Sequence, residues 1–85
     1  MADYRLIISR SAAKEFEALP SIIIERVREK IRSLVHDPRP PGSKKLQGRP
    51  EWRVRVGDYR ILYTIDDPGK VVGIRAVGHR SRAYD

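Results

Sequence analysis

Arginines at alternate positions are the residues of this sequence best suited to chemistry on a charged substrate. Arg53 and Arg55 alternate with apolar residues in the segment 52–56, and Arg60 follows a Gly57-Asp58 dipeptide. If that dipeptide closes a two-residue β-hairpin, Arg55 lies opposite Arg60 and the three guanidinium groups share one sheet face. Like charges directly opposite each other cost up to about 1 kcal/mol, whereas guanidinium groups grip phosphate with paired hydrogen bonds. We therefore interpret this face as a phosphate-binding surface.

Further basic and aromatic side chains extend this surface toward the C-terminus. If the next loop holds four residues, Arg75 joins the same face, and Arg80 and Arg82 follow the last strand. Tyr84 is suited to stacking on an unpaired base; the alternative is a tyrosine at a frayed end or folded onto the core. Several arginines on one face favour a nucleic-acid footprint, although solubilising charge on an exposed strand explains any single one.

The two histidines add one candidate for proton transfer. His79 lies between Gly78 and Arg80, at the predicted end of the basic face, where an imidazole can move protons near neutral pH; the alternative is phosphate binding or packing. His36 ends a predicted helix, and we assign it no chemistry. The sequence has no cysteine and no cluster of carboxylates, so we expect no metal site and no cofactor.

Composition and charge narrow the class of protein. The 85 residues are 40% hydrophobic, which predicts one folded domain over residues 1–85. Lys and Arg number 18 against 11 Asp and Glu, a net charge of +7, which favours nucleic acid, acidic proteins or anionic surfaces as partners. The longest apolar run, Ile22 to Ile24, is too short to span a bilayer, and residues 1–10 do not resemble a signal peptide. We therefore expect a soluble cytoplasmic protein that does not enter a membrane and binds a nucleic acid.

The elements that position these side chains follow from hydrophobic periodicity. A β-rich segment at 4–8 predicts a strand, and Ser9 or Ser11 is suited to capping a helix that ends at Ala18, before Leu19-Pro20 breaks it. The remaining predicted elements are a helix capped by Ser21 and running to about His36, and strands at 52–56, 59–65 and 71–77, the last ended by Gly78. The predicted class is α+β: an N-terminal strand, a helical hairpin and a three-stranded antiparallel meander, with the helices packed on one sheet face.

Several short motifs along the chain suggest a family. They are Ala12–Phe16, Leu19-Pro20, Lys45–Gly48, Gly57–Tyr63 and Val77–Arg80. In this order and spacing, and over nearly the whole chain from Tyr4 to about Tyr84, they resemble the RelE/ParE superfamily of toxins from type II toxin–antitoxin systems. The resemblance implies a RelE-like fold and membership of the RelE-type branch.

The RelE-type branch implies a ribosome-dependent endoribonuclease, an mRNA interferase that cuts messenger RNA in the ribosomal A site. In this family's reaction the ribose 2′-hydroxyl attacks the adjacent phosphate and expels the 5′-oxygen without a metal ion. The resemblance places catalytic residues at Arg53, Arg55, Arg60, Arg80 and Tyr84, and the further RNA-binding candidates are Lys44, Lys45, Arg75, His79 and Arg82. Arginine is a poor general base because its pKa lies above about 12. The base therefore stays open among Lys44, Lys45, His79 and a group of the ribosome.

The resemblance also implies a protein partner. Such toxins are held inactive by an antitoxin encoded beside them, whose acidic or amphipathic segment wraps the toxin, and a net charge of +7 suits such a complex. Two alternative functions stay open: a ParE-type inhibitor of DNA gyrase without catalysis, and a plain basic nucleic-acid-binding module.

Overall fold

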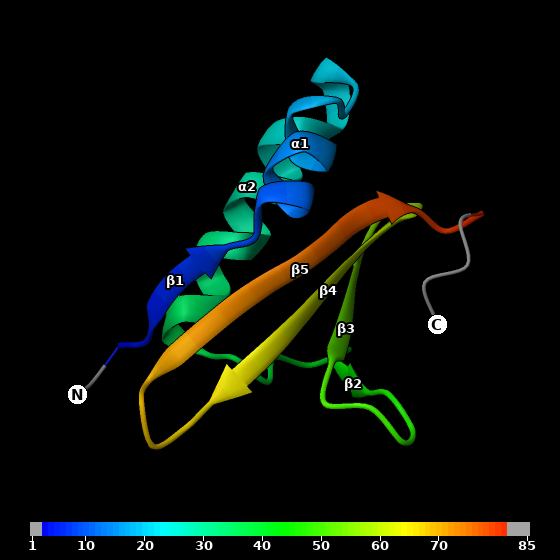
Figure 1. The fold of residues 1–85 in the computed structure, drawn as a ribbon. Coiled ribbons are helices and arrows are strands. Elements are labelled where there is room, and N and C mark those ends of the chain that lie inside the picture. Colours follow the sequence, from blue (N-terminus) through cyan, green and yellow to red (C-terminus); the bar gives the residue numbers. More distant parts are fainter. Residues whose placement is uncertain (1–2, 82–85) are drawn as a thin grey trace.

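The computed structural model describes residues 3–81, in which two helices cover one face of a five-stranded sheet (Figure 1). In chain order the elements are β1 (Arg5–Ile8), α1 (Arg10–Glu17), α2 (Ser21–His36), β2 (Lys44–Lys45), β3 (Trp52–Val56), β4 (Tyr59–Asp66) and β5 (Val71–His79). The strand order is β1-β5-β4-β3-β2, with β1 parallel to β5 and every other pair antiparallel. The predicted α+β class, the helical hairpin and the antiparallel meander are confirmed. Within residues 3–81 no helix is long and apolar enough to cross a membrane.

The two helices begin in different ways. Ser9 caps α1, because its Oγ accepts a hydrogen bond from the Ala12 backbone N–H at 3.1 Å. The prediction that Ser21 caps α2 is wrong: Ser21 is already helical, and Pro20 occupies the capping position. The Pro20 carbonyl accepts the Ile23 N–H at 3.0 Å, since the fixed φ of proline holds the chain ready for the first helical turn.

The main core lies between the helices and the face of the sheet turned toward them, which we call the inner face. Tyr63 on β4 and Leu34 on α2 have no exposed surface, and Trp52 and Tyr59 pack at the rim of the core while remaining partly exposed. The buried members are Ala12, Ile23, Val27, Ile31, Leu34, Val54, Val56, Ile61, Tyr63, Val72, Ile74 and Val77. Alternate positions of β3 and β4 therefore hold the sheet on the helices, which leaves the other set for the opposite, outer face.

The last strand is longer than the sequence predicts. The predicted end of β5 at Val77 is wrong, because Gly78 pairs with Arg60 and His79 pairs with Tyr59. A glycine in this position continues the ladder through its backbone, although it has no side chain to contribute. The two extra residues decide on which face His79 lies.

Candidate functional site

The hairpin of β3 and β4 places three arginines on the outer face. Arg55 pairs with Arg60 and Arg53 with Leu62, which is the predicted register. Gly57 has a φ of 59°, as the first turn residue of a type II′ hairpin requires. Arg55 is exposed, whereas Arg53 and Arg60 are half-buried and the Nε of Arg60 is buried. Because paired residues of antiparallel strands share a face, the structure brings all three guanidinium groups together.

A small apolar cluster forms a floor beside these arginines. Leu62 is 3% exposed and clusters with Leu46 and Ala76, and on its two sides it pairs with Arg53 of β3 and Ala76 of β5. The sequence analysis missed this floor, because Ala76 reaches the outer face only through a β-bulge next to Leu62. The available signal was the leucine itself, an apolar residue at an outward-facing position. Guanidinium groups around an apolar floor can hold phosphate while a flat apolar group packs between them.

Arg75 lies at that bulge. The cross-strand pairs on either side involve Ala76 and Ile74, so Arg75 is the inserted residue of β5. Its side chain is exposed, next to the buried Ile74, and its carbonyl accepts a hydrogen bond from the Ser9 Oγ at 3.4 Å. Arg75 therefore lies toward β1, near the edge of the sheet that is farther from β3.

The two lysines before β3 form a short strand, β2, that was not predicted, and their side chains lie on opposite faces of the sheet. Lys44 pairs with Arg53 and Lys45 with Trp52, so Lys44 shares the outer face with Arg53 and Lys45 is turned the other way. The Nζ of Lys45 donates to the Arg49 carbonyl at 2.8 Å. Of the two lysines, the structure brings Lys44 alone to the arginines.

His79 lies on the inner side of the sheet, which corrects its expected place at the end of the basic face. It pairs with Tyr59, whose ring it meets edge-on with centroids 5.2 Å apart. Its Nδ1 accepts the Ser81 backbone N–H at 3.1 Å, so the neutral ring carries its proton on Nε2. The physical reason for the correction is the longer β5, which places Gly78 rather than His79 beside Arg60. Across residues 3–81, no three His, Cys, Asp or Glu side chains gather as a metal site.

Arg80 stays close to the hairpin turn. Its backbone N–H donates to the Asp58 carbonyl at 2.7 Å, and its Nε lies 3.5 Å from the Asp58 Oδ1, with both side chains about two-thirds exposed. Exposed pairs of this kind contribute little energy, so the guanidinium group remains accessible to a polyanion. The predicted Arg82 and Tyr84 lie outside the described residues.

An arginine that the sequence analysis did not single out has a well-matched partner. Arg39 forms two hydrogen bonds with the Asp67 carboxylate, at 2.8 and 3.3 Å, and the Tyr4 hydroxyl donates to the same carboxylate at 2.6 Å. The hydrogen bonds from Arg39 and then from Tyr4 lower the pKa of Asp67 to about 2. Arg39 also lies 5.1 Å from the centre of the Trp52 ring. This clamp ties the loop after α2 to the end of β4, and no sequence motif marks it.

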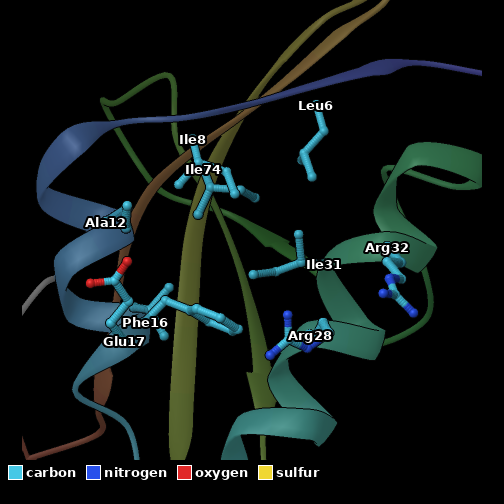
Figure 2. A pocket seen from close by; sticks show the side chains of 11 residues that line it. Leu6, Ile8, Ala12, Phe16, Glu17, Arg28, Ile31, Arg32 and Ile74 are labelled. Carbon is cyan, nitrogen blue, oxygen red and sulfur yellow. The ribbon is translucent and has the colours of Figure 1, made fainter.

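A second surface feature is a groove of about 350 Å³ between β1 and the two helices. Figure 2 shows the apolar side chains of Leu6, Ile8, Phe16, Ile31 and Ile74 around it. Arg28 and Arg32 border it on α2, and each is 3.3 Å from a glutamate three residues earlier on the same helix. The groove is therefore mainly apolar, with Arg28, Arg32 and Glu17 as the charged side chains of its lining, unlike the outer face.

Comparison with known proteins identifies the family. Residues 6–84 match the family described as ParE toxin of type II toxin–antitoxin system. The mRNA interferase toxin RelE of Escherichia coli K12 is 31% identical over 94% of this chain and 86% of its own length.

Solved toxin–antitoxin complexes share the fold. The archaeal RelE–RelB complex of Pyrococcus horikoshii matches with a TM-score of 0.82 and 31% identity, over 95% of this chain and 99% of the matched chain. The RelBE2 complex of Mycobacterium tuberculosis matches with a TM-score of 0.81 and 30% identity, over 93% of this chain and 100% of the matched chain. The RelE-like fold is thus confirmed. The chain belongs to the RelE/ParE family of toxins of type II toxin–antitoxin systems, as its sequence motifs predicted.

Proposed function

We propose that this toxin is a ribosome-dependent endoribonuclease that cuts messenger RNA. The observation that carries the proposal is Arg55 placed directly opposite Arg60, on an accessible face with an apolar floor. Two like charges in that register work against folding, whereas an RNA backbone in the same place would be bound by both. The relative from Escherichia coli, 31% identical, is named an mRNA interferase, which supports the same activity.

The proposed reaction is an internal transesterification. The ribose 2′-oxygen forms a bond to the adjacent phosphorus while the bond from phosphorus to the 5′-oxygen breaks. Arg60, whose Nε is buried, is held by packing, and with Arg53 it stabilises the charge that develops on the phosphate. A well-placed donor of this kind is worth about 3–4 kcal/mol in the transition state.

The reaction needs two proton transfers. The 2′-hydroxyl must lose a proton, and Lys44 is the best-placed candidate base because it pairs with Arg53 on the outer face. Lys45 is turned away from the arginines and His79 lies on the inner side of the sheet. The alternative to Lys44 is therefore a base supplied by the ribosome. The 5′-oxygen develops negative charge as it leaves, which Arg80 is the candidate to neutralise, and it then takes a proton from water or from the base that accepted the 2′-proton. We also propose that Tyr84 stacks on a base, and that Arg75 and Arg82 bind RNA outside the reacting phosphate.

Partners and conditions follow from the family. We propose that a cognate antitoxin holds the protein inactive, as the RelE–RelB pairing in the matched structures suggests. We also propose that it acts in the cytoplasm, where translating ribosomes are found. Arginines supply the charge stabilisation that a metal ion supplies in other nucleases, so the proposed reaction proceeds without a metal at the site.

Primer extension on a reporter message in a purified translation system tests the activity. We expect cuts at A-site codons only when ribosomes and this protein are both present. A single 2′-deoxynucleotide at the cut position should abolish cleavage there, and the upstream fragment should end in a 2′,3′-cyclic phosphate. Cleavage that survives the 2′-deoxy substitution would exclude the proposed attack.

A second candidate function is supported by the name of the matching family, which is described as ParE toxin. A ParE-type inhibitor of DNA gyrase would induce DNA breaks and an SOS response while translation continued. Gyrase supercoiling assays beside the translation assay separate the two functions. A plain nucleic-acid-binding module would leave both processes intact while still binding RNA with a steep salt dependence.

A further inference from the structure

The free edge of β3 borders a second cleft, lined by charged residues, that the proposed reaction does not use. The cleft, of about 680 Å³, lies between α2 and the β3–β4 turn. Arg26 and Lys30 line it from the helix, and Arg55 and Gly57 line it from the hairpin. β2 pairs only with Trp52 and Arg53, so in the described part of the chain no strand covers β3 beyond them.

The charges lining this cleft are unbalanced toward the positive. Its two glutamates, Glu25 and Glu29, are each 3.3 Å from an arginine three residues later on the helix. In contrast, neither Arg26 nor Lys30 forms an ion pair with any residue between 3 and 81. Each glutamate of the cleft therefore has a cation of α2 from outside the cleft beside it, whereas Arg26 and Lys30 have no acidic partner among residues 3–81.

The cleft is also joined to the outer face. Arg55 lines it and at the same time pairs with Arg60 on β4. Arg26 packs against the hairpin turn, because a Cβ placed on Gly57 would lie 3.5 Å from its Nη1. Arg55 thus connects the arginines of the outer face with Arg26 and Lys30 on α2, around the edge of the sheet.

We infer that this cleft binds the phosphate backbone of an RNA segment outside the reacting phosphate. The inference rests on the proposed function, since it extends the RNA path from the outer face around the edge of β3 to α2. Lysine and arginine side chains beside a glycine can bind the phosphates of a nucleic-acid backbone, and such contacts do not recognise the base sequence. The lining holds one residue with an apolar side chain, Val56, which is buried, and the cations beside it match the charge of a phosphate backbone.

A charge-removing double variant, Arg26→Gln with Lys30→Gln, tests the inference. Its binding is measured at several salt concentrations with two probes, a single-stranded oligouridine and purified ribosomes with an empty A site. Each phosphate contact contributes about 0.7 to the salt dependence on single strands, so the slope should fall by about 1.4. A smaller salt slope with both probes identifies single-stranded RNA, such as the message, as the ligand. A smaller slope with ribosomes alone identifies ribosomal RNA.

Matched controls separate a site from bulk charge. Arg10→Gln with Lys14→Gln removes two exposed cations at the same spacing on α1 and should leave both slopes as in the wild type. Arg26→Lys with Lys30→Arg keeps the charge and should keep the slopes. Thermal unfolding of each variant shows whether the fold is intact.

Two results would overturn the inference. One is a double variant whose slopes equal those of the wild type with both probes, or fall no more than those of the α1 control. The other is loss of affinity for an acidic peptide with RNA binding unchanged, which would assign the cleft to a protein partner. The binding readout is independent of cleavage: a wild type that binds as predicted but cuts nothing would refute the proposed function and leave this inference standing.

Discussion

The inner and outer faces of the β3–β4 hairpin share one backbone but differ in what their side chains do. On the inner face Val54, Val56 and Ile61 are at most 6% exposed and pack on the helices. On the outer face, one residue away in each case, Arg53, Arg55 and Arg60 carry three like charges. The inner face is explained by folding alone. The outer face, where Arg55 lies opposite Arg60, is the surface that we propose binds a ligand from outside the fold.

Arg39 shows what an arginine looks like when folding does account for it. It has two hydrogen bonds to Asp67 and lies over the ring of Trp52. Arg55, by comparison, has no ion pair with any residue between 3 and 81 and faces another arginine. The contrast teaches that the position of a charge relative to its neighbours, rather than its presence, separates a structural arginine from a binding one.

Among substitutions that test this difference between the faces, the largest expected effect is a loss of stability on the inner face. Ile61 is fully buried between the sheet and the helices. Ile61→Ala should lower the free energy of unfolding by about 2–5 kcal/mol, through lost burial and the cavity left behind. Urea unfolding followed by circular dichroism measures it. A loss under about 1 kcal/mol would contradict tight packing of the inner face against the helices.

Substitution of Arg60, the residue next to Ile61, should affect cleavage strongly and stability little. Arg60→Ala should reduce the rate of ribosome-dependent cleavage by about 10²–10³-fold, the usual effect of losing one transition-state donor. The free energy of unfolding should change by no more than about 1 kcal/mol. Single-turnover cleavage on programmed ribosomes gives the rate, and the same urea titration gives the stability. Unchanged cleavage in a folded Arg60→Ala protein would remove the outer face from the reaction.

Much of the fold could be predicted because local signals and tertiary contacts agree. The spacing of Val27, Ile31 and Leu34 marks α2, and all three are buried. The strict alternation of β3 and the glycine at position 57 together define the hairpin register. β2 could not be predicted, because Lys44-Lys45 has no apolar alternation and becomes a strand only by pairing with distant residues.

The site was predictable only in part for the same reason. Arg53, Arg55 and Arg60 lie within one hairpin, so side-chain alternation alone groups them. His79 was misplaced because its face depends on how far β5 continues past Gly78. The apolar floor depends on a bulge opposite Leu62, and nothing in the local sequence specifies a bulge there.

A subtler change on the inner face tests the hydrogen bond of the buried Tyr63. The Tyr63 hydroxyl donates to the Pro38 carbonyl at 2.7 Å, and burial raises the pKa of Tyr63 to about 12. Tyr63→Phe should cost about 1–3 kcal/mol, because a buried carbonyl loses its donor.

The pH dependence of Tyr63 provides an independent check. The folded protein holds the phenol proton more tightly than the unfolded chain, so wild-type stability should fall as the pH rises from about 10 to about 12. Tyr63→Phe should lack this component of the alkaline decline. Parallel curves for the two proteins in this range would contradict the assignment.

On the outer face, removing a charge should stabilise the protein. Arg55→Thr relieves the repulsion from Arg60 and places a β-branched residue in a strand, so the free energy of unfolding should rise by up to about 1 kcal/mol. The same variant should bind RNA more weakly. The gain should shrink at high salt, where exposed charges are screened. A loss of stability at low salt would show that Arg55 is held by folding contacts after all.

The smallest effect concerns the Arg39–Asp67 clamp, where an arginine serves the fold. Its hydrogen bonds lower the pKa of Asp67 from 3.8 to about 2, so the ionised carboxylate is favoured in the folded state. The clamp therefore contributes its full stabilisation above about pH 4 and loses it as the pH falls toward 2. Asp67→Asn should be less stable than the wild type at neutral pH, and the difference should narrow through this window. Because the carboxylate is about half exposed, the whole effect should be small. A difference that is constant from pH 6 to about 2 would show that the Asp67 charge is not what ties the loop to the sheet.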